Sequence, residues 1–315
     1  MGAVRLVLLI AFAPMSCVPG AADAPPASRP EARAVAFLAR EVPEWPVRNK
    51  CYSCHNNGDA ARALYAARRV AVPFETRSLE STNRWLVRPQ DWKDNDPKEE
   101  FGDQRLASLQ FAHALVAAVE TGAVARDETF VRAAEKVREH QDPDGSWNVD
   151  ASGLAGSPIT YGRTLATVVA RNVLAAASPN RFAEAVRRAE AWLGTQRPRS
   201  VLDAAAILIG PATREQKVEC LEVLRKGQSR EGGWGPYVTA APEVFDTSVA
   251  LLALTGVREE AGILEMKARG RGFLVRAQQP DGSWPETTRP PGAESYAQRI
   301  STTGWATLAL LAITP

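Results

Sequence analysis

The chain has 315 residues, which is enough for one large domain or two ordinary ones. Hydrophobic residues make up 45% and charged residues 23% of the chain, an ordinary balance for a globular protein. The 38 basic residues nearly equal the 36 acidic ones, so no basic surplus indicates a nucleic-acid partner. The four cysteines do not have the pattern of a disulfide framework.

The first residues have the features of an export signal. Arg5 places a positive charge near the start, and the apolar run over residues 6–13 is too short to span a membrane as a stable helix. We therefore predict that residues 1–22 are a signal peptide. The mature protein is then extracytoplasmic, in a bacterial periplasm.

Two patterns compete for how this signal is processed. Ser16-Cys17 fits a lipoprotein signal, in which a lipidated Cys17 would attach the protein to a membrane. Ordinary cleavage after Ala22 or Ala24 would instead release a soluble form. Residues 23–30 belong to an Ala- and Pro-rich stretch and are predicted to be a disordered linker. No later stretch is long and apolar enough for a transmembrane helix.

Two cysteines and a histidine fall together in Cys51-Tyr52-Ser53-Cys54-His55, which is the haem-attachment spacing of c-type cytochromes. Two thiols on one tight turn can reach the two vinyl groups of one haem. The adjacent histidine is then held under the iron as its proximal ligand. We therefore expect Cys51 and Cys54 to bind haem c covalently and His55 to ligate its iron.

Other functions of this motif have to be weighed against haem binding. A closed zinc site needs a fourth ligand, and none lies at a regular spacing. A dithiol redox pair or a disulfide would use the cysteines but would leave His55 unexplained. For the sixth iron ligand, His113, His140 and an open or water-bound iron are the alternatives.

A repeated sequence predicts the fold. The pattern Gln-x-x-x-Gly-x-Trp occurs three times, starting at Gln141, Gln228 and Gln278. Each copy follows a charged amphipathic helix and precedes a helix that is apolar nearly all round, as suits a helix buried on both sides. The helices expected before the copies are 127–140, 214–226 and 266–277, and those expected after them are 161–177, 245–254 and 301–313.

The same alternation continues outside the copies and gives about six pairs of outer and inner helices. The further pairs are expected at 31–40 with 59–69, 78–87 with 105–120, and 181–195 with 201–209. The sequence therefore predicts an all-α, (α/α)6-type toroid over residues 31–315. The haem motif at 51–55 falls in the turn of the first pair, so the toroid itself must supply the haem pocket.

The three Gln-x-x-x-Gly-x-Trp copies resemble the repeat of squalene–hopene cyclases and of the related terpenoid cyclases and protein prenyltransferases. The resemblance covers roughly Glu31 to the C-terminus and is strong from Asp127 onward. It implies a toroid of inner helices around a central cavity. It says little about chemistry, because the Gln and Trp of the motif tie one helix end to the next turn.

The same resemblance argues against the usual reactions of that family. Its class II cyclases start the reaction with a protonating aspartate at the head of an inner helix. The matching position here is Phe245, and an aromatic ring cannot donate that proton. The prenyltransferases hold zinc with Asp, Cys and His, and neither His113 nor His140 belongs to such a set.

Some residues with reactive side chains have a plain structural explanation. Asp59, Asp203 and Asp246 recur near the starts of inner helices, where a short carboxylate caps free backbone N–H groups and complements the helix dipole. We expect helix capping for all three. Cys220 lies in a helical stretch and is expected to be a buried small hydrophobe.

The expected function follows from the motif and the fold together. We expect an exported mono-haem c-type protein on a cyclase-like toroid, which transfers electrons to a redox partner protein or senses redox state. The alternative is a binder or altered enzyme for an apolar, isoprenoid or polymeric ligand in the toroid cavity. Aromatic residues on inner helices would line that cavity, namely Tyr161, Phe245 and Trp305.

Overall fold

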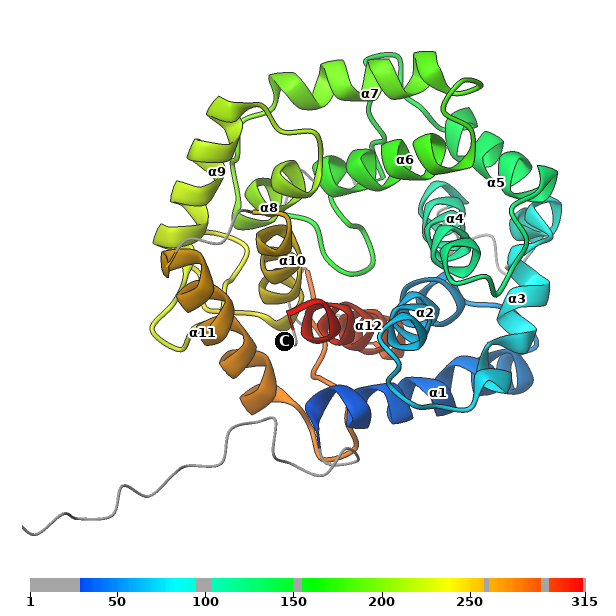
Figure 1. The fold of residues 1–315 in the computed structure, drawn as a ribbon, viewed down its shortest axis with the longest axis horizontal. Coiled ribbons are helices and arrows are strands. Elements are labelled where there is room, and N and C mark those ends of the chain that lie inside the picture. Colours follow the sequence, from blue (N-terminus) through cyan, green and yellow to red (C-terminus); the bar gives the residue numbers. More distant parts are fainter. Residues whose placement is uncertain (1–28, 95–103, 150–154, 258–260, 290–294, 314–315) are drawn as a thin grey trace, which may run out of the picture.

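The computed structural model describes residues 29–94, 104–149, 155–257, 261–289 and 295–313. Within these residues, helices form two concentric rings (Figure 1). The outer helices are α1 (Pro30–Asn49), α3 (Glu80–Leu86), α5 (Glu128–Glu139), α7 (Ala183–Thr195), α9 (Arg214–Gly227) and α11 (Ala261–Ala277). The inner helices are α2 (Ala61–Arg69), α4 (Gln104–Glu120), α6 (Arg163–Ala177), α8 (Val201–Ile209), α10 (Val244–Thr255) and α12 (Tyr296–Ile313). The predicted (α/α)6-type toroid is confirmed.

The inner ring is closed. Each inner helix packs against the next one, and α12 returns to pack against α2. These helices are buried on both sides, as their apolar composition predicts: 10 of the 12 residues of α10 and 12 of the 18 residues of α12 are buried. No helix of the described residues is long and apolar enough to cross a membrane. The predicted signal peptide and residues 23–28 of the predicted linker lie outside the described residues.

The Gln-x-x-x-Gly-x-Trp turns hold the two rings together, and the second copy shows how. The indole N–H of Trp234 donates to the carbonyl of Leu224 in α9 over 2.7 Å, and the Trp234 backbone N–H donates to Thr247 Oγ1 in α10 over 2.8 Å. The Gln228 amide donates to the carbonyl of Met266 in α11 over 2.9 Å. One turn therefore links its own outer and inner helices to the following outer helix.

The third copy makes the same contacts and closes the ring. The Gln278 amide donates over 2.9 Å to the carbonyl of Pro30, the first residue of α1. The carboxylate of Glu31 pairs with Arg271 of α11 over 2.5 Å. The last repeat thus contacts α1 as the second copy contacts its following outer helix, and these contacts close the ring.

The first helix pair differs from its prediction. Helix α1 continues to Asn49, beyond the expected end at residue 40, although it contains Pro43 and Pro46. The inner partner does not start at Asp59, because a π-helical segment, Cys54–Ala60, precedes α2. Helices α11 and α12 also begin about five residues earlier than the expected starts at 266 and 301.

We predict that the glycine of the repeat cannot be replaced without loss of stability. Gly232 has a φ of +95°, and a Cβ there would lie 2.5 Å from the carbonyl oxygen of Arg269. Gly232→Ala should therefore lower the free energy of unfolding by more than about 1 kcal/mol, measured by urea denaturation. Gly194→Ala is the control, because no atom lies within 4 Å of the added methyl group. Its unfolding free energy should stay equal or rise, by about 1 kcal/mol at most.

Candidate functional site

The haem motif lies where the first pair of helices turns inward. Cys51 precedes the turn, and Cys54 and His55 begin the π-helical segment that leads into α2. Both cysteines are partly exposed, and neither is in a disulfide. The Ser53 hydroxyl caps the segment by accepting the backbone N–H of His55 over 3.2 Å. The segment is thus an ordered helix start next to two partly exposed cysteines.

Asn57 takes over the role that glutamine has in the three Gln-x-x-x-Gly-x-Trp turns. Its amide donates to Val42 O in α1 over 3.4 Å and to Thr82 Oγ1 in α3 over 2.8 Å, while its Oδ1 accepts from Ser53 N–H over 3.1 Å. Val42 is four residues before Pro46, which has no N–H to offer its carbonyl. The side chain of Asn57 therefore replaces the hydrogen bond that Pro46 lacks, and the turn is held without the Gln-x-x-x-Gly-x-Trp pattern.

The imidazole of His55 is held by the last inner helix. Its Nδ1 lies 2.9 Å from the hydroxyl oxygen of Ser301 in α12. Burial lowers the pKa of His55 to about 4, so the ring is neutral at physiological pH. Among the described residues, no hydrogen bond engages its other nitrogen, Nε2. A neutral imidazole with one nitrogen oriented and the other available has the chemistry of a metal ligand.

Aromatic pairs flank the motif on both sides. Tyr52 stacks on Trp85 with ring centroids 4.5 Å apart, and Trp45 stacks on Tyr296 at 5.1 Å. The indole N–H groups of Trp45 and Trp85 and the Asn56 Oδ1 atom are buried without a hydrogen-bond partner. Buried polar atoms nearly always have a partner. Three orphaned atoms around one motif therefore indicate that a further polar group belongs there.

Directly below the motif lies a buried carboxylate, Asp59, on which several elements converge. Its oxygens accept hydrogen bonds from Gln110 of α4 over 2.9 Å, from the Trp305 indole of α12 over 3.3 Å, and from the Tyr161 hydroxyl. Arg62 of α2 pairs with it at 3.3 Å. Burial raises the pKa of Asp59, and these partners oppose that rise.

Two glycines allow the helices to approach Asp59 this closely. A Cβ at Gly304 of α12 would lie 3.0 Å from the carbonyl oxygen of Asp59, and a Cβ at Gly58 would lie 3.1 Å from Gln110 Cβ. Backbone contact at this distance leaves no room for a side chain. The π-helical segment is therefore clamped between α4 and α12.

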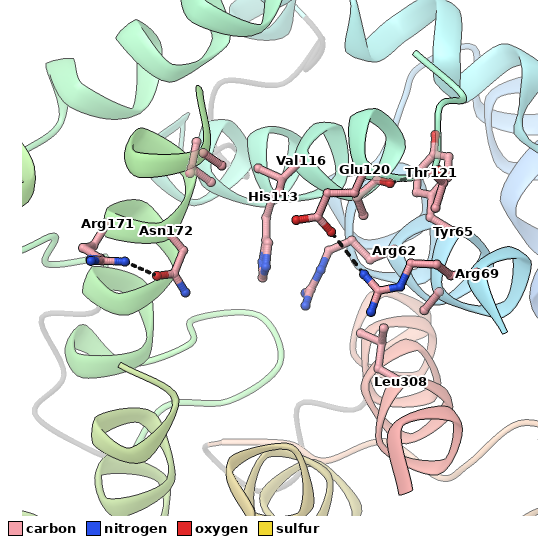
Figure 2. Close-up of a pocket in the computed structure, with 14 residues that line it drawn as sticks. Arg62, Tyr65, Arg69, His113, Val116, Glu120, Thr121, Arg171, Asn172 and Leu308 are labelled. Carbon is pink, nitrogen blue, oxygen red and sulfur yellow. Dashed lines mark hydrogen bonds and ion pairs between the residues drawn. The ribbon is translucent and has the colours of Figure 1, made fainter. Parts of the chain in front are cut away.

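Beyond Asp59 the lumen of the toroid contains a cavity of about 450 Å³ (Figure 2). Its lining comes from α2, α4, α6 and α12 and mixes apolar with charged groups. Arg62 connects it to the Asp59 cluster, because its guanidinium stacks on Trp305 with 4.6 Å to the ring centroid. In Figure 2 the side chains of Arg62 and His113 point into the same space. The lumen is therefore filled at the level of Asp59 and hollow beyond it.

The cavity carries more positive than negative side chains. Arg62, Arg69 and Arg171 line it together with one carboxylate, Glu120, which pairs with Arg69 at 3.2 Å. The Nδ1 atom of His113 is buried without a partner. Burial, and secondarily the charge of Arg62, holds the pKa of His113 well below its ordinary value.

The sequence-predicted residues lie in different parts of the molecule. Cys51, Cys54 and His55 share the first turn, whereas His113 lines the lumen cavity and His140 ends α5 as its C-cap residue. No contact described here joins either histidine to His55, and their role as sixth ligand stays a prediction. Within the described residues, no group of three or more His, Cys, Asp or Glu side chains is arranged to hold a metal ion.

The aromatic residues expected to line the cavity instead fill the lumen. Tyr161 and Phe245 both meet the Trp305 ring edge-on, with centroids 5.5 and 5.6 Å away. All three are almost fully buried, and none lines the cavity of Figure 2. The position that the cyclase resemblance assigns to a proton donor is thus a buried phenyl ring. Cys220 is buried as expected, and burial raises its pKa to about 12.

None of the three aspartates is an N-cap residue, so the capping prediction is wrong, although Asp203 and Asp246 do lie in the first turn of their helices. Ser53 and Glu243 occupy the N-cap positions near Asp59 and Asp246, and Asp246 instead pairs with Arg289. Asp203 accepts a backbone N–H, from Arg199 over 3.3 Å, although Ser200 is the N-cap residue. Asp59 and Asp246 are both buried, and each pairs with an arginine instead of capping a helix.

The Asp59 cluster itself was not predicted. The sequence feature that could have indicated this cluster is the presence of two polar residues, Arg62 and Gln110, on inner helices, because a buried polar side chain requires a partner.

Comparison with known proteins supports the fold alone. No protein-family model and no curated protein matches the chain. The type II terpene cyclase MstE from Scytonema is similar in structure, with a TM-score of 0.57 and 15% identity over 91% of this chain and 98% of that one. A structure described as a wild-type glycosidase has a TM-score of 0.56 and 11% identity over 89% and 97%. The chain therefore has a terpene-cyclase-like α/α toroid.

We predict that His113 makes the protein less stable in acid. Because its pKa is lowered on folding, its contribution to stability is complete above about pH 6.5 and is lost as the pH falls. His113→Gln cannot titrate, so this variant should lose less unfolding free energy than the wild type between about pH 7 and pH 5. Urea denaturation at both pH values measures the difference. Equal losses in the two proteins would contradict the prediction.

Proposed function

We propose that the protein is an exported mono-haem c-type protein, built on a terpene-cyclase-like toroid, that transfers electrons or senses redox state. The observation that carries the proposal is the state of the motif: two partly exposed cysteines outside any disulfide and three residues apart, followed by a neutral histidine whose Nδ1 contacts Ser301. These are the groups that covalent haem attachment requires.

The residues around the motif fit such a group. Each thiol, Cys51 and Cys54, would add across one vinyl double bond. This addition breaks the S–H bond and the π bond and forms one S–C and one C–H bond, so it needs no external oxidant or reductant. His55 would offer Nε2 to the iron. The orphaned indole N–H groups of Trp45 and Trp85 are suitable donors for the carboxylates that a haem carries. When bound, the haem would supply one-electron chemistry, and burial and hydrogen bonding would set its potential.

We predict that the protein retains haem covalently when it is exported by a bacterial strain that matures cytochromes c. After denaturation and reduction, the haem should stay with the polypeptide and show a c-type visible spectrum. Cys51→Ala and Cys54→Ala should each lose one thioether and retain much less haem. Cys220→Ala is the matched control and should retain haem as the wild type does, because Cys220 is buried in α9.

Two outcomes would contradict this expectation. A wild-type protein without covalently retained haem in such a strain would refute the proposal. Equal loss of haem in all three cysteine variants would show that misfolding, not loss of the thioether bonds, explains the effect.

A second candidate function rests on the lumen cavity. We infer that the lumen cavity binds a small amphipathic molecule with an acidic group. The cavity combines apolar side chains such as Val116 and Leu308 with the arginines at positions 62, 69 and 171. This lining does not favour a pure hydrocarbon, because a hydrocarbon would remove water from the charged side chains without offering them a hydrogen bond.

Filling the cavity tests this candidate. Organic extraction of the purified protein, followed by mass spectrometry, should release such a molecule from the wild type. Val116→Trp places a large ring in the cavity and should remove it, whereas Val218→Trp, on the exposed face of α9, should not. Absence of any extracted molecule from the wild type, or equal amounts from both variants, would count against binding.

A further inference from the structure

Arg62 belongs both to the Asp59 cluster and to the lining of the lumen cavity. Its Nη1 donates to Asp59 Oδ1 over 3.3 Å, and its guanidinium stacks on the Trp305 ring at 4.6 Å. Within the part of the chain that the structure describes, this is the one hydrogen bond that Arg62 makes. A guanidinium carries several N–H donors in a fixed fork. Arg62 therefore has donors left for a group in the cavity.

The other two arginines of the cavity are more fully engaged. Arg171 donates through Nε to Glu190 of α7 over 2.9 Å, and its Nη2 pairs with the same carboxylate at 2.5 Å. Arg69 pairs with Glu120 at 3.2 Å, and its side chain is 64% exposed (Figure 2). An anion in the cavity would have to displace Glu190 or Glu120 to reach these arginines.

Asp59 can share Arg62 because it has other donors. Gln110 donates to its Oδ2 over 2.9 Å, the Trp305 indole donates to the same atom over 3.3 Å, and the Tyr161 hydroxyl donates to Oδ1. The contact with Arg62 is single and long by comparison. A second anion could therefore approach the guanidinium without leaving the Asp59 carboxylate unpaired.

His113 supplies a second donor beside Arg62. Its Nδ1 atom is buried without a hydrogen-bond partner, and Figure 2 shows both side chains pointing into the same space. A neutral imidazole can carry its hydrogen on Nδ1 and donate it. Buried polar atoms nearly always have a partner. A group that only accepts hydrogen bonds and carries a negative charge would satisfy both side chains.

We propose that Arg62 and His113 bind the carboxylate of a monocarboxylic acid, whose apolar chain lies along Val116, Val173 and Leu308 of the cavity lining. This inference rests on the second candidate function, because it assigns the residues that hold the acidic group of that ligand. Charge-assisted hydrogen bonds from the guanidinium fix the head group. The three apolar side chains give the tail a surface on which it loses contact with water.

The charge balance favours a carboxylate over a phosphate ester. The greater charge of a phosphate would need a further cation, and the carboxylates of Glu120 and Glu190 already occupy Arg69 and Arg171. The bound carboxylate and Asp59 then share one guanidinium, so each weakens the hold of the other on Arg62. This sharing predicts opposite effects for substitutions at the two positions.

Octanoate and 1-octanol test the site, because they have the same chain length and differ in the acidic group. Near neutral pH, isothermal titration calorimetry of the purified full chain should show octanoate binding about tenfold more tightly. Val116→Trp should abolish octanoate binding by filling the cavity. Arg187→Gln, at an exposed position of α7, is the control and should bind as the wild type does. Equal binding of the two probes, or octanoate binding retained by Val116→Trp, would overturn the inference.

His113→Phe separates binding from folding. The phenyl ring is planar like imidazole but has no N–H, and it removes a buried polar atom that has no partner. The unfolding free energy should therefore stay equal or rise, while octanoate affinity should fall about fivefold. Arg62→Gln should lose more affinity than Arg62→Lys, which keeps the charge without the fork. Unchanged affinity in His113→Phe or Arg62→Gln would also overturn the inference.

Asp59→Asn tests whether Arg62 is shared. The change keeps the size of the side chain and removes its charge, so Arg62 is released to the ligand and octanoate should bind more tightly than to the wild type. Damage to the cluster would instead weaken binding. Equal or weaker binding by this variant, with the circular dichroism and urea midpoint of the wild type, would refute the sharing. If it does not fold, the Arg62 and His113 variants still decide the site.

This inference and the second candidate function fail separately. Organic extraction that releases no molecule counts against a resident ligand, while the octanoate titrations still decide whether Arg62 and His113 bind a carboxylate. An extracted molecule without an acidic group, together with equal binding of octanoate and 1-octanol, would overturn the carboxylate site and leave the cavity as a binding site.

Discussion

The buried carboxylate of Asp59 is the interaction on which the haem-motif side of the toroid depends. It receives donors from α2, α4, the segment before α6, and α12, so it joins elements from the beginning, middle and end of the chain. A buried charge is tolerable only when all its partners are in place. Within a low-dielectric interior the partners in turn hold the helices that carry them at fixed positions.

The motif occupies a turn that lacks the Gln-x-x-x-Gly-x-Trp pattern. In the three turns that have this pattern, a glutamine and a tryptophan connect three helices, and a glycine permits the tight backbone. Here Asn57 makes the equivalent links to α1 and α3. Its partner in α1 is the carbonyl of Val42, which lacks a helical hydrogen bond because Pro46 has no N–H. Asn57 therefore makes these links in the same segment that carries Cys51, Cys54 and His55.

The lumen combines a filled end and a hollow end. Trp305, Phe245 and Tyr161 fill it beside Asp59, where the cyclase resemblance would place a proton donor. The remaining cavity is lined by arginines and a neutral histidine. The fold therefore persists with a different set of lumen side chains, as expected when a scaffold is stabilised by its helix packing and turns and not by its site.

The sequence by itself determined the ring of helix pairs and the proximity of Cys51, Cys54 and His55, because both are local. Helix periodicity and the Gln-x-x-x-Gly-x-Trp turns act over a few residues, and the cysteines and histidine of the motif are neighbours in the chain. Only the tertiary structure decided which side chains surround His55 and Asp59. The partners of Asp59 lie 51, 102 and 246 residues away from it, at Gln110, Tyr161 and Trp305. Closure of the ring brings them together, and no local pattern encodes which side chains meet when a twelve-helix ring closes.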